Sequence, residues 1–97
     1  MSSKTRKLKF MWMLTTMIGG EPTGSCLTGT FRSVYKIATF DLQIAMPNLT
    51  ERAAREQYKK TGNCLIYNKL EFESLDEARF SPIGKVSWIR KVLIRKT

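Results

Sequence analysis

The sequence predicts an α+β, β-rich fold: a mostly antiparallel sheet of four to five strands with one short surface helix. The chain has 97 residues, which is enough for one domain only. Apolar side chains alternate with polar ones in several segments, as they do in half-buried strands. One segment alone has both a start and a stop signal for a helix. We expect residues 8–97 to form a single β-rich domain and residues 1–7 a mobile basic tail.

The first half of the chain is predicted to be extended. Residues 8–18 are rich in aromatic and bulky side chains and form the first strand. Residues 19–25 contain three glycines and a proline, which are typical of a loop. Within residues 27–46, apolar side chains recur at every second position: Phe40, Leu42, Ile44 and Met46. This period predicts a strand with a bend or bulge, or two successive strands, ended by Pro47.

The second half contains the predicted helix. Asn48 can cap its start, Glu51 three residues later completes a capping-box-like pair, and Gly62 supplies the stop. Residues 64–73 alternate again and predict a strand, residues 74–77 predict one helical turn, and residues 86–94 predict the last strand.

The first and last predicted strands are both apolar on their two faces. Met11, Met13 and Met17 lie opposite Trp12 by strand parity, so neither face of residues 8–18 is polar. So small a domain cannot bury four apolar strand faces in its own core. We therefore expect a homo-oligomer in which a partner copy covers part of this surface.

The residue types argue against catalysis and metal binding. The chain has no histidine and two cysteines, Cys26 and Cys64, whose flanking residues supply no metal-ligand spacing. Nucleophilic catalysis needs a base beside serine or cysteine, and histidine is the usual one. We expect no enzyme activity, no cofactor and free cysteines.

The positive charge is concentrated at the two ends of the chain. There are 17 basic and 8 acidic residues, a net charge of +9. Residues 10–84 hold eight of each sign, so the whole excess lies outside them. Clusters of one sign indicate a polyanionic partner, either an anionic membrane or a nucleic acid. The candidate contact residues are Lys4, Arg6, Lys7, Lys9, Lys85, Arg90, Lys91, Arg95 and Lys96.

The two tryptophans have three possible roles. Strand parity places Trp12 with Phe10 and Leu14, which favours a core position for its ring. Insertion into a membrane interface or a subunit contact is the second possibility. The third is stacking on nucleic-acid bases, which requires a ring exposed beside basic groups. The same three roles are open for Trp88.

Two segments resemble matrix proteins of negative-strand RNA viruses. The start Met1-Ser2-Ser3-Lys4, followed by Arg6, Lys7 and Lys9, is similar to the basic starts of rhabdovirus matrix proteins. The stretch from Lys7-Leu8-Lys9-Phe10 through Ile18-Gly19-Gly20 to Thr23-Gly24-Ser25 resembles a strand-and-loop segment of paramyxovirus matrix proteins. The chain departs from that family in its short length and in its isolated prolines, which form no late-budding motif.

The resemblance implies a non-enzymatic, oligomerising structural protein. Such a protein would lie in the virion or host cytoplasm on the inner face of a membrane, and it would not be secreted. Its basic segments would bind the anionic membrane surface and possibly nucleoprotein. The alternative is a small RNA-binding protein, for instance a viral silencing suppressor or an RNA chaperone. A third possibility is a small adaptor whose basic ends bind an acidic protein.

Overall fold

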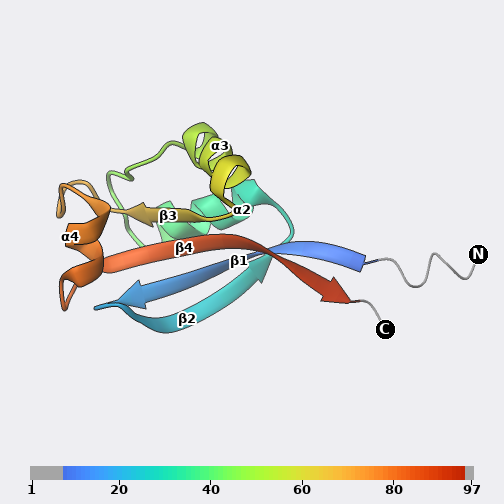
Figure 1. Ribbon diagram of the computed structural model, residues 1–97, viewed down its shortest axis with the longest axis horizontal. Coiled ribbons are helices and arrows are strands. Elements are labelled where there is room, and N and C mark those ends of the chain that lie inside the picture. Colours follow the sequence, from blue (N-terminus) through green and yellow to red (C-terminus); the bar gives the residue numbers. More distant parts are fainter. Residues whose placement is uncertain (1–7, 96–97) are drawn as a thin grey trace, which may run out of the picture.

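A four-stranded antiparallel sheet with strand order β2-β1-β4-β3 forms the body of the protein (Figure 1). The computed structural model describes the backbone of residues 8–95 and the side chains of residues 10–94. The predicted α+β, β-rich class is therefore confirmed, and the predicted tail at residues 1–7 lies outside the described residues. The elements are β1 (Leu8–Ile18), β2 (Glu21–Thr28), α2 (Phe31–Lys36), the π-helix η1 (Ile37–Asp41), α3 (Glu51–Thr61), β3 (Cys64–Tyr67), α4 (Leu75–Phe80) and β4 (Lys85–Arg95).

The first strand is confirmed, but the loop predicted after it is wrong. Gly19 and Gly20 have φ angles of +64° and +85°, which L side chains rarely adopt and glycine adopts without strain. Two such residues make a tight hairpin turn, so β2 begins at Glu21 and pairs with β1 as far as Thr28.

The extended structure predicted for residues 27–46 is also wrong. Thr30 caps α2 by accepting a hydrogen bond from the Ser33 N–H at 3.1 Å. Phe31, Val34, Tyr35 and Ala38 are buried, and their spacing of three and four residues is the period of one helix face. The alternation at residues 40–46 does not mark one buried strand face, because Phe40 and Met46 are 69% and 50% exposed whereas Ile44 is buried.

The one predicted surface helix exists as α3, with a different cap. Thr50, not Asn48, accepts the hydrogen bond from the Ala53 N–H, and Gly62 ends the helix with a φ of +80°. Asn48 instead pairs with the outer edge of β3: its Oδ1 accepts from the Tyr67 N–H and its Nδ2 donates to the Leu65 carbonyl. The outer edge of β3 is therefore occupied, and the strand ends at Tyr67 instead of continuing to residue 73 as predicted.

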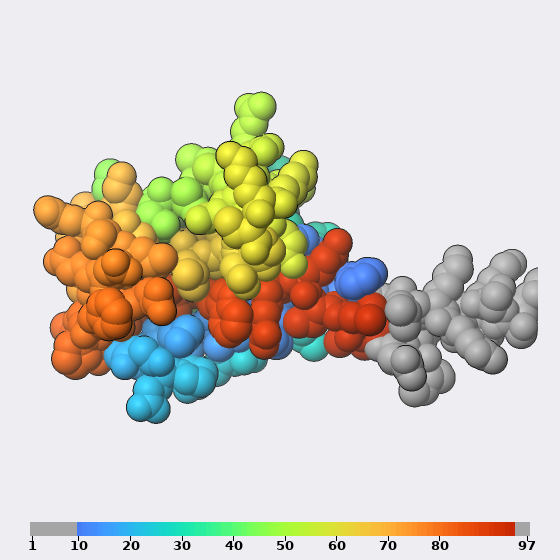
Figure 2. Space-filling model, in the orientation of Figure 1, coloured from blue at the N-terminus to red at the C-terminus, as the bar shows by residue number. Residues whose placement is uncertain are grey.

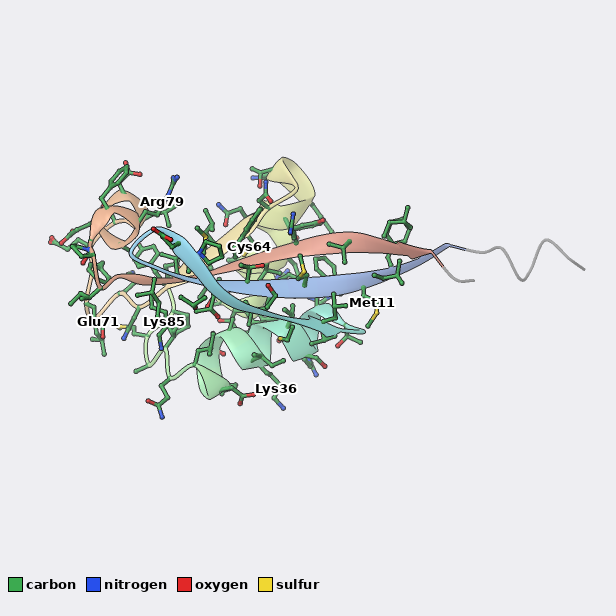
Figure 3. All side chains as sticks on the ribbon, turned by 90° about the horizontal axis from the view of Figure 1, so that it is seen from below. Met11, Lys36, Cys64, Glu71, Arg79 and Lys85 are labelled. Carbon is green, nitrogen blue, oxygen red and sulfur yellow. The ribbon has the colours of Figure 1, made fainter. Side chains whose placement is uncertain are left out.

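The two faces of the sheet are covered differently. One face packs against α2, η1 and α3 around the buried residues Leu14, Phe31, Val34, Tyr35, Ala38, Ile44, Ala54, Cys64, Ile66 and Ile89. On the other face α4 covers one end only, over Tyr67, Ala78 and Val86. Figure 3 shows Lys36 of α2 and Arg79 of α4 on opposite sides of the sheet. We call the remainder of the second face the open face.

β1 and β4 pair along their full length and extend past the other strands. Their register runs from Leu8–Arg95 to Ile18–Lys85, whereas the pairing of β1 with β2 starts at Trp12. The end of the sheet is therefore a two-stranded ribbon (Figure 1), and the space-filling view shows early and late parts of the chain in contact beside this end (Figure 2). We call residues 8–12 and 91–95 the ribbon end. Within the described part of the chain, no helix has the length and apolar character needed to span a membrane.

Candidate anion-binding surface

The ribbon end brings together the described end of each basic segment. Lys9 lies opposite Ile94 and Arg95 lies opposite Leu8, so the described chain begins and ends at the same end of the sheet (Figure 1). The side chains of Lys9 and Arg95, and the whole of Lys4, Arg6, Lys7 and Lys96, lie outside the described structure. Because β1 and β4 are antiparallel, segments separated by the whole chain meet here.

Lys91 is the predicted contact residue that the structure places on this end with its side chain defined. Its Nζ lies 5.0 Å from the centroid of the Phe10 ring and 5.6 Å from that of Trp12. Phe10 faces Leu93 across the two strands, and these side chains are 54% and 50% exposed. A cation and an exposed apolar pair therefore share one face of the ribbon end.

Lys85 and Arg90 lie elsewhere. Lys85 pairs with Ile18 at the far end of β4, about 33 Å from Arg95 at the usual rise of a strand. Its Nζ donates a hydrogen bond to the Leu42 carbonyl at 3.0 Å. Arg90 lies on the open face, with its guanidinium carbon 4.4 Å from the Trp88 ring centroid. The nine predicted contact residues therefore do not form one surface.

A groove beside the ribbon end contains two basic residues that the sequence analysis missed. This cavity of about 340 Å³ is lined by Trp12, Phe31, Arg55, Tyr58, Lys59 and Lys91. Arg55, Tyr58 and Lys59 are three and four residues apart on α3 and so share one helix face. We call this cavity the basic groove.

Aromatic contacts fix the wall of the basic groove. The Trp12 ring meets Phe31 and Tyr58 edge to face, with centroid distances of 4.9 and 4.8 Å. The Tyr58 hydroxyl accepts a hydrogen bond from the Lys91 backbone N–H at 3.0 Å. Lys91 lies beyond Ile89, the last residue of β4 in this direction that pairs with β3. Trp12 is therefore mainly a packing residue, as strand parity predicted, with its ring edge at the groove.

The cations of the basic groove differ in how they are neutralised. Glu51 forms an ion pair with Arg55 at 3.1 Å and with Arg32 at 3.5 Å. For Lys59 and Lys91, no carboxylate of the described side chains lies within 4.0 Å. The groove therefore keeps two uncompensated positive charges beside aromatic rings, a combination suited to an anionic group.

The cysteines contribute no charge to this surface. Both are free, Cys26 half-buried and Cys64 buried. Burial raises the pKa of the Cys64 thiol to about 12, so the thiol stays protonated and unreactive at neutral pH.

Comparison of the chain with protein-family models, with curated proteins and with solved structures finds no match.

Proposed function

We propose that this protein binds anionic membrane surfaces peripherally, as a non-enzymatic, self-associating structural protein of viral matrix type. The observation that supports the proposal is the composition of the ribbon end. The antiparallel β1–β4 pair joins two acid-free basic segments to an end that exposes Phe10 and Leu93. Apolar side chains that enter the interface, surrounded by cations that contact lipid headgroups, are the usual basis of peripheral membrane binding.

The magnitudes are consistent with reversible binding. Each basic residue near an anionic leaflet contributes about 1 kcal/mol. Complete burial of a phenylalanine or leucine side chain contributes about 1.5–3 kcal/mol. Because Phe10 and Leu93 are each about half exposed, their remaining exposed area adds about 2 kcal/mol together. The apolar pair therefore matters as much as two of the cations, and neither contribution is sufficient alone.

RNA binding is the second candidate, and the basic groove supports it. Lys59 and Lys91 flank Trp12 and Tyr58 there, which is the arrangement of a groove for a single-stranded nucleic acid. The membrane is the better candidate because Trp12 and Tyr58 already use their rings in contacts with each other. The exposed apolar pair is Phe10 and Leu93, and Leu93 cannot stack on a base.

The test compares the two partners at one ionic strength, because both bind electrostatically and both weaken with salt. The full chain is sedimented with phosphatidylserine-containing vesicles and, in parallel, run in a gel shift with single-stranded RNA. We expect vesicle binding that greatly exceeds binding to neutral phosphatidylcholine vesicles. Retention of RNA without any vesicle binding would replace the membrane proposal with the RNA one.

A further inference from the structure

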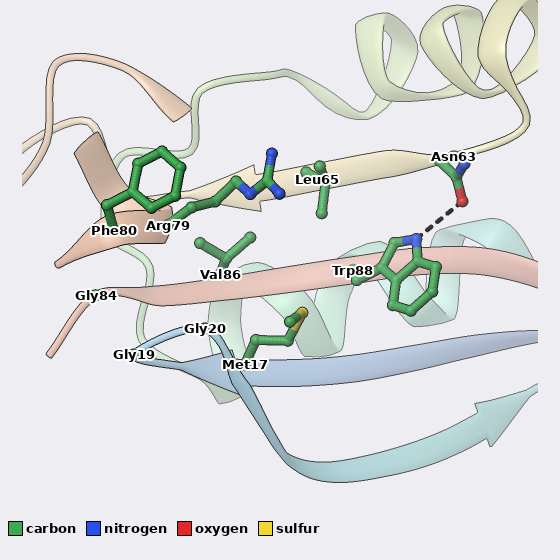
Figure 4. Close-up of a pocket in the computed structure, with 10 residues that line it drawn as sticks. All are labelled: Met17, Gly19, Gly20, Asn63, Leu65, Arg79, Phe80, Gly84, Val86 and Trp88. Carbon is green, nitrogen blue, oxygen red and sulfur yellow. Dashed lines mark hydrogen bonds between the residues drawn. The ribbon is translucent and has the colours of Figure 1, made fainter. Parts of the chain in front are cut away.

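A second cavity, of about 580 Å³, lies at the opposite end of the sheet between α4 and the open face (Figure 4). Its floor is apolar and comes from three strands: Met17 of β1, Leu65 of β3, and Val86 and Trp88 of β4. The Trp88 Nε1–H donates to the Asn63 Oδ1 at 2.9 Å. This bond fixes the indole and leaves it no free donor for a ligand.

Close backbone contacts fix one end of this cavity in advance. A Cβ atom at Gly19 would lie 2.6 Å from the Pro82 carbonyl oxygen, and one at Gly84 would overlap the Ala78 carbonyl oxygen. The Gly19 N–H donates to the Gly84 carbonyl at 3.1 Å. The β1–β2 turn and the segment before β4 are therefore held together by contacts that need glycine, and the cavity does not depend on a ligand for its shape.

Two arginines at the cavity form no ion pair with the described carboxylates. Arg79 of α4 lines it (Figure 4), and no carboxylate of the described side chains lies within 4.0 Å of this guanidinium. Next to it on the open face, Arg90 covers the Trp88 ring, and its buried Nε has no hydrogen-bond acceptor. By strand parity, the described positions of the open face in β1, β3 and β4 include no aspartate or glutamate.

We propose that this surface binds an acidic peptide segment of a partner protein. An apolar side chain of the segment fills the cavity over Leu65, Val86 and Trp88, and flanking carboxylates pair with Arg79 and Arg90. An arginine binds a carboxylate with two parallel hydrogen bonds, which adds orientation to affinity. The site lies at the other end of the sheet from the ribbon end (Figure 1), so one molecule can contact a membrane and this partner together.

Charge complementarity favours an acidic peptide over the other possible occupants. A second copy docked by the same face would place Arg79 and Arg90 against their own equivalents, which is repulsive. Single-stranded RNA would need several exposed rings in succession to stack its bases. The cavity is lined by two rings, Trp88 on its floor and Phe80 on α4, and Arg90 already covers one face of Trp88, so the described rings give no run of free stacking faces.

The experiment uses the full chain labelled with ¹⁵N and two synthetic peptides. One peptide has phenylalanine and leucine flanked on both sides by pairs of aspartates, and the matched peptide has asparagine in place of every aspartate. The chain has two tryptophans, so its two indole N–H signals report separately on the second cavity and on the basic groove. We expect the acidic peptide to shift the Trp88 signal saturably and to leave the Trp12 signal in place.

Two variants connect the binding to charge. Arg79→Gln should weaken the acidic peptide about tenfold, or about 1.4 kcal/mol, whereas Arg52→Gln, the same change at an exposed arginine of α3, should leave affinity unchanged. Both positions are exposed, and dispersed amide signals will show that each variant is folded. The proposal is overturned if the acidic peptide leaves Trp88 unmoved, if the asparagine peptide binds equally well, if Arg79→Gln binds normally, or if RNA alone shifts Trp88.

Discussion

Phe10 lies directly opposite Leu93 in the β1–β4 pair, and about half of each side chain is exposed to solvent. Most exposed apolar residues are scattered singly over a protein surface and need no explanation. This pair is different because the two residues are adjacent, lie on the same face as Lys91 and stand where the chain enters and leaves the sheet. The pair gives the membrane proposal its most direct test.

Replacement of Phe10 and Leu93 together by serine should weaken vesicle binding and leave the fold intact. The loss of about 2 kcal/mol of apolar transfer corresponds to a factor of about 30 in the partition coefficient. Phe80→Ser is the matched control, because Phe80 is 78% exposed at the other end of the sheet. Vesicle sedimentation measures the partition coefficient, and circular dichroism checks the fold. Equal binding by the double variant and the wild type would remove the ribbon end from the interface.

Two lysines of β4 should separate binding from stability. Lys91→Gln removes a cation from the ribbon end and should reduce vesicle binding about fivefold, since one basic residue contributes about 1 kcal/mol. Lys85→Gln removes the hydrogen bond from Nζ to the Leu42 carbonyl and should lower the free energy of unfolding by about 1 kcal/mol, with vesicle binding unchanged. Urea unfolding and sedimentation distinguish the two effects. A larger binding defect in Lys85→Gln would contradict this assignment.

The two tryptophans should differ in their contribution to stability. Trp12 packs against the main core and contacts two aromatic rings, so Trp12→Ala should cost about 3–5 kcal/mol and can unfold a domain this small. Trp88 is half-buried on the open face, and its replacement by alanine should cost about 1–2 kcal/mol. Urea unfolding of Trp12→Phe, a milder change, keeps the comparison measurable if Trp12→Ala does not fold.

The sequence analysis predicted the long strands better than the elements between them. β1 and β4 carry bulky apolar side chains on both faces within their eleven residues, a composition typical of strands. Between them, the helical spacing of Phe31, Val34 and Tyr35 was present, but the later alternation masked it. Residues 31–46 contain both a helical spacing and a strand-like alternation of apolar side chains. Long-range packing against the sheet decides which structure forms.

The candidate surface could be predicted only in part. The charge asymmetry identified Lys91 and the terminal segments, but the strand pairing that brings those segments together is a contact across the whole chain. Arg55 and Lys59 were overlooked because Glu51 and Glu56 offset their positive charge when the net charge of the segment is counted. In the structure Glu51 is turned toward Arg55 and Arg32, so Lys59 stays uncompensated among the described side chains.

The buried thiol of Cys64 should make stability fall at alkaline pH. Its pKa is raised to about 12 by burial, whereas in an unfolded chain a cysteine titrates near 8.5. The unfolded state therefore loses this proton first, and the stabilisation, complete below about pH 8.5, is lost progressively as the pH rises toward 12. The slope is about 1.4 kcal/mol per pH unit.

Cys64→Ala should remove this slope, measured by urea unfolding between pH 8.5 and 10. Below pH 10 the tyrosines contribute little, although burial also raises the pKa of Tyr35. A thiol reagent supplies an independent measurement at neutral pH, because Cys26 is half-buried and Cys64 is buried. The native protein should react at one cysteine and the unfolded protein at two. An unchanged slope in the variant would show that another group causes the alkaline loss.

The outer edge of β2 is the part of the sheet that we expect to join a second copy. β3 is closed at its edge by Asn48, whereas β2 pairs with β1 alone within the described chain. Beyond Glu21, residues 22–28 carry no charge, and uncharged edge strands are the ones that pair between molecules. Antiparallel pairing of two β2 strands would form a continuous eight-stranded sheet with two-fold symmetry.

Such a dimer would strengthen membrane binding through avidity. The four N-terminal cations Lys4, Arg6, Lys7 and Lys9 supply about 4 kcal/mol at most from one chain, which is weak binding, and two chains supply about twice that before ordering costs. Light scattering at micromolar concentration should return twice the chain mass of 11.2 kDa. Leu27→Lys places a charge beside the free edge, at a side chain that is 47% exposed, and should give a folded monomer that binds vesicles more weakly than the dimer. A wild-type mass of 11.2 kDa would contradict the dimer. A Leu27→Lys monomer with undiminished vesicle binding would show that a single ribbon end is sufficient.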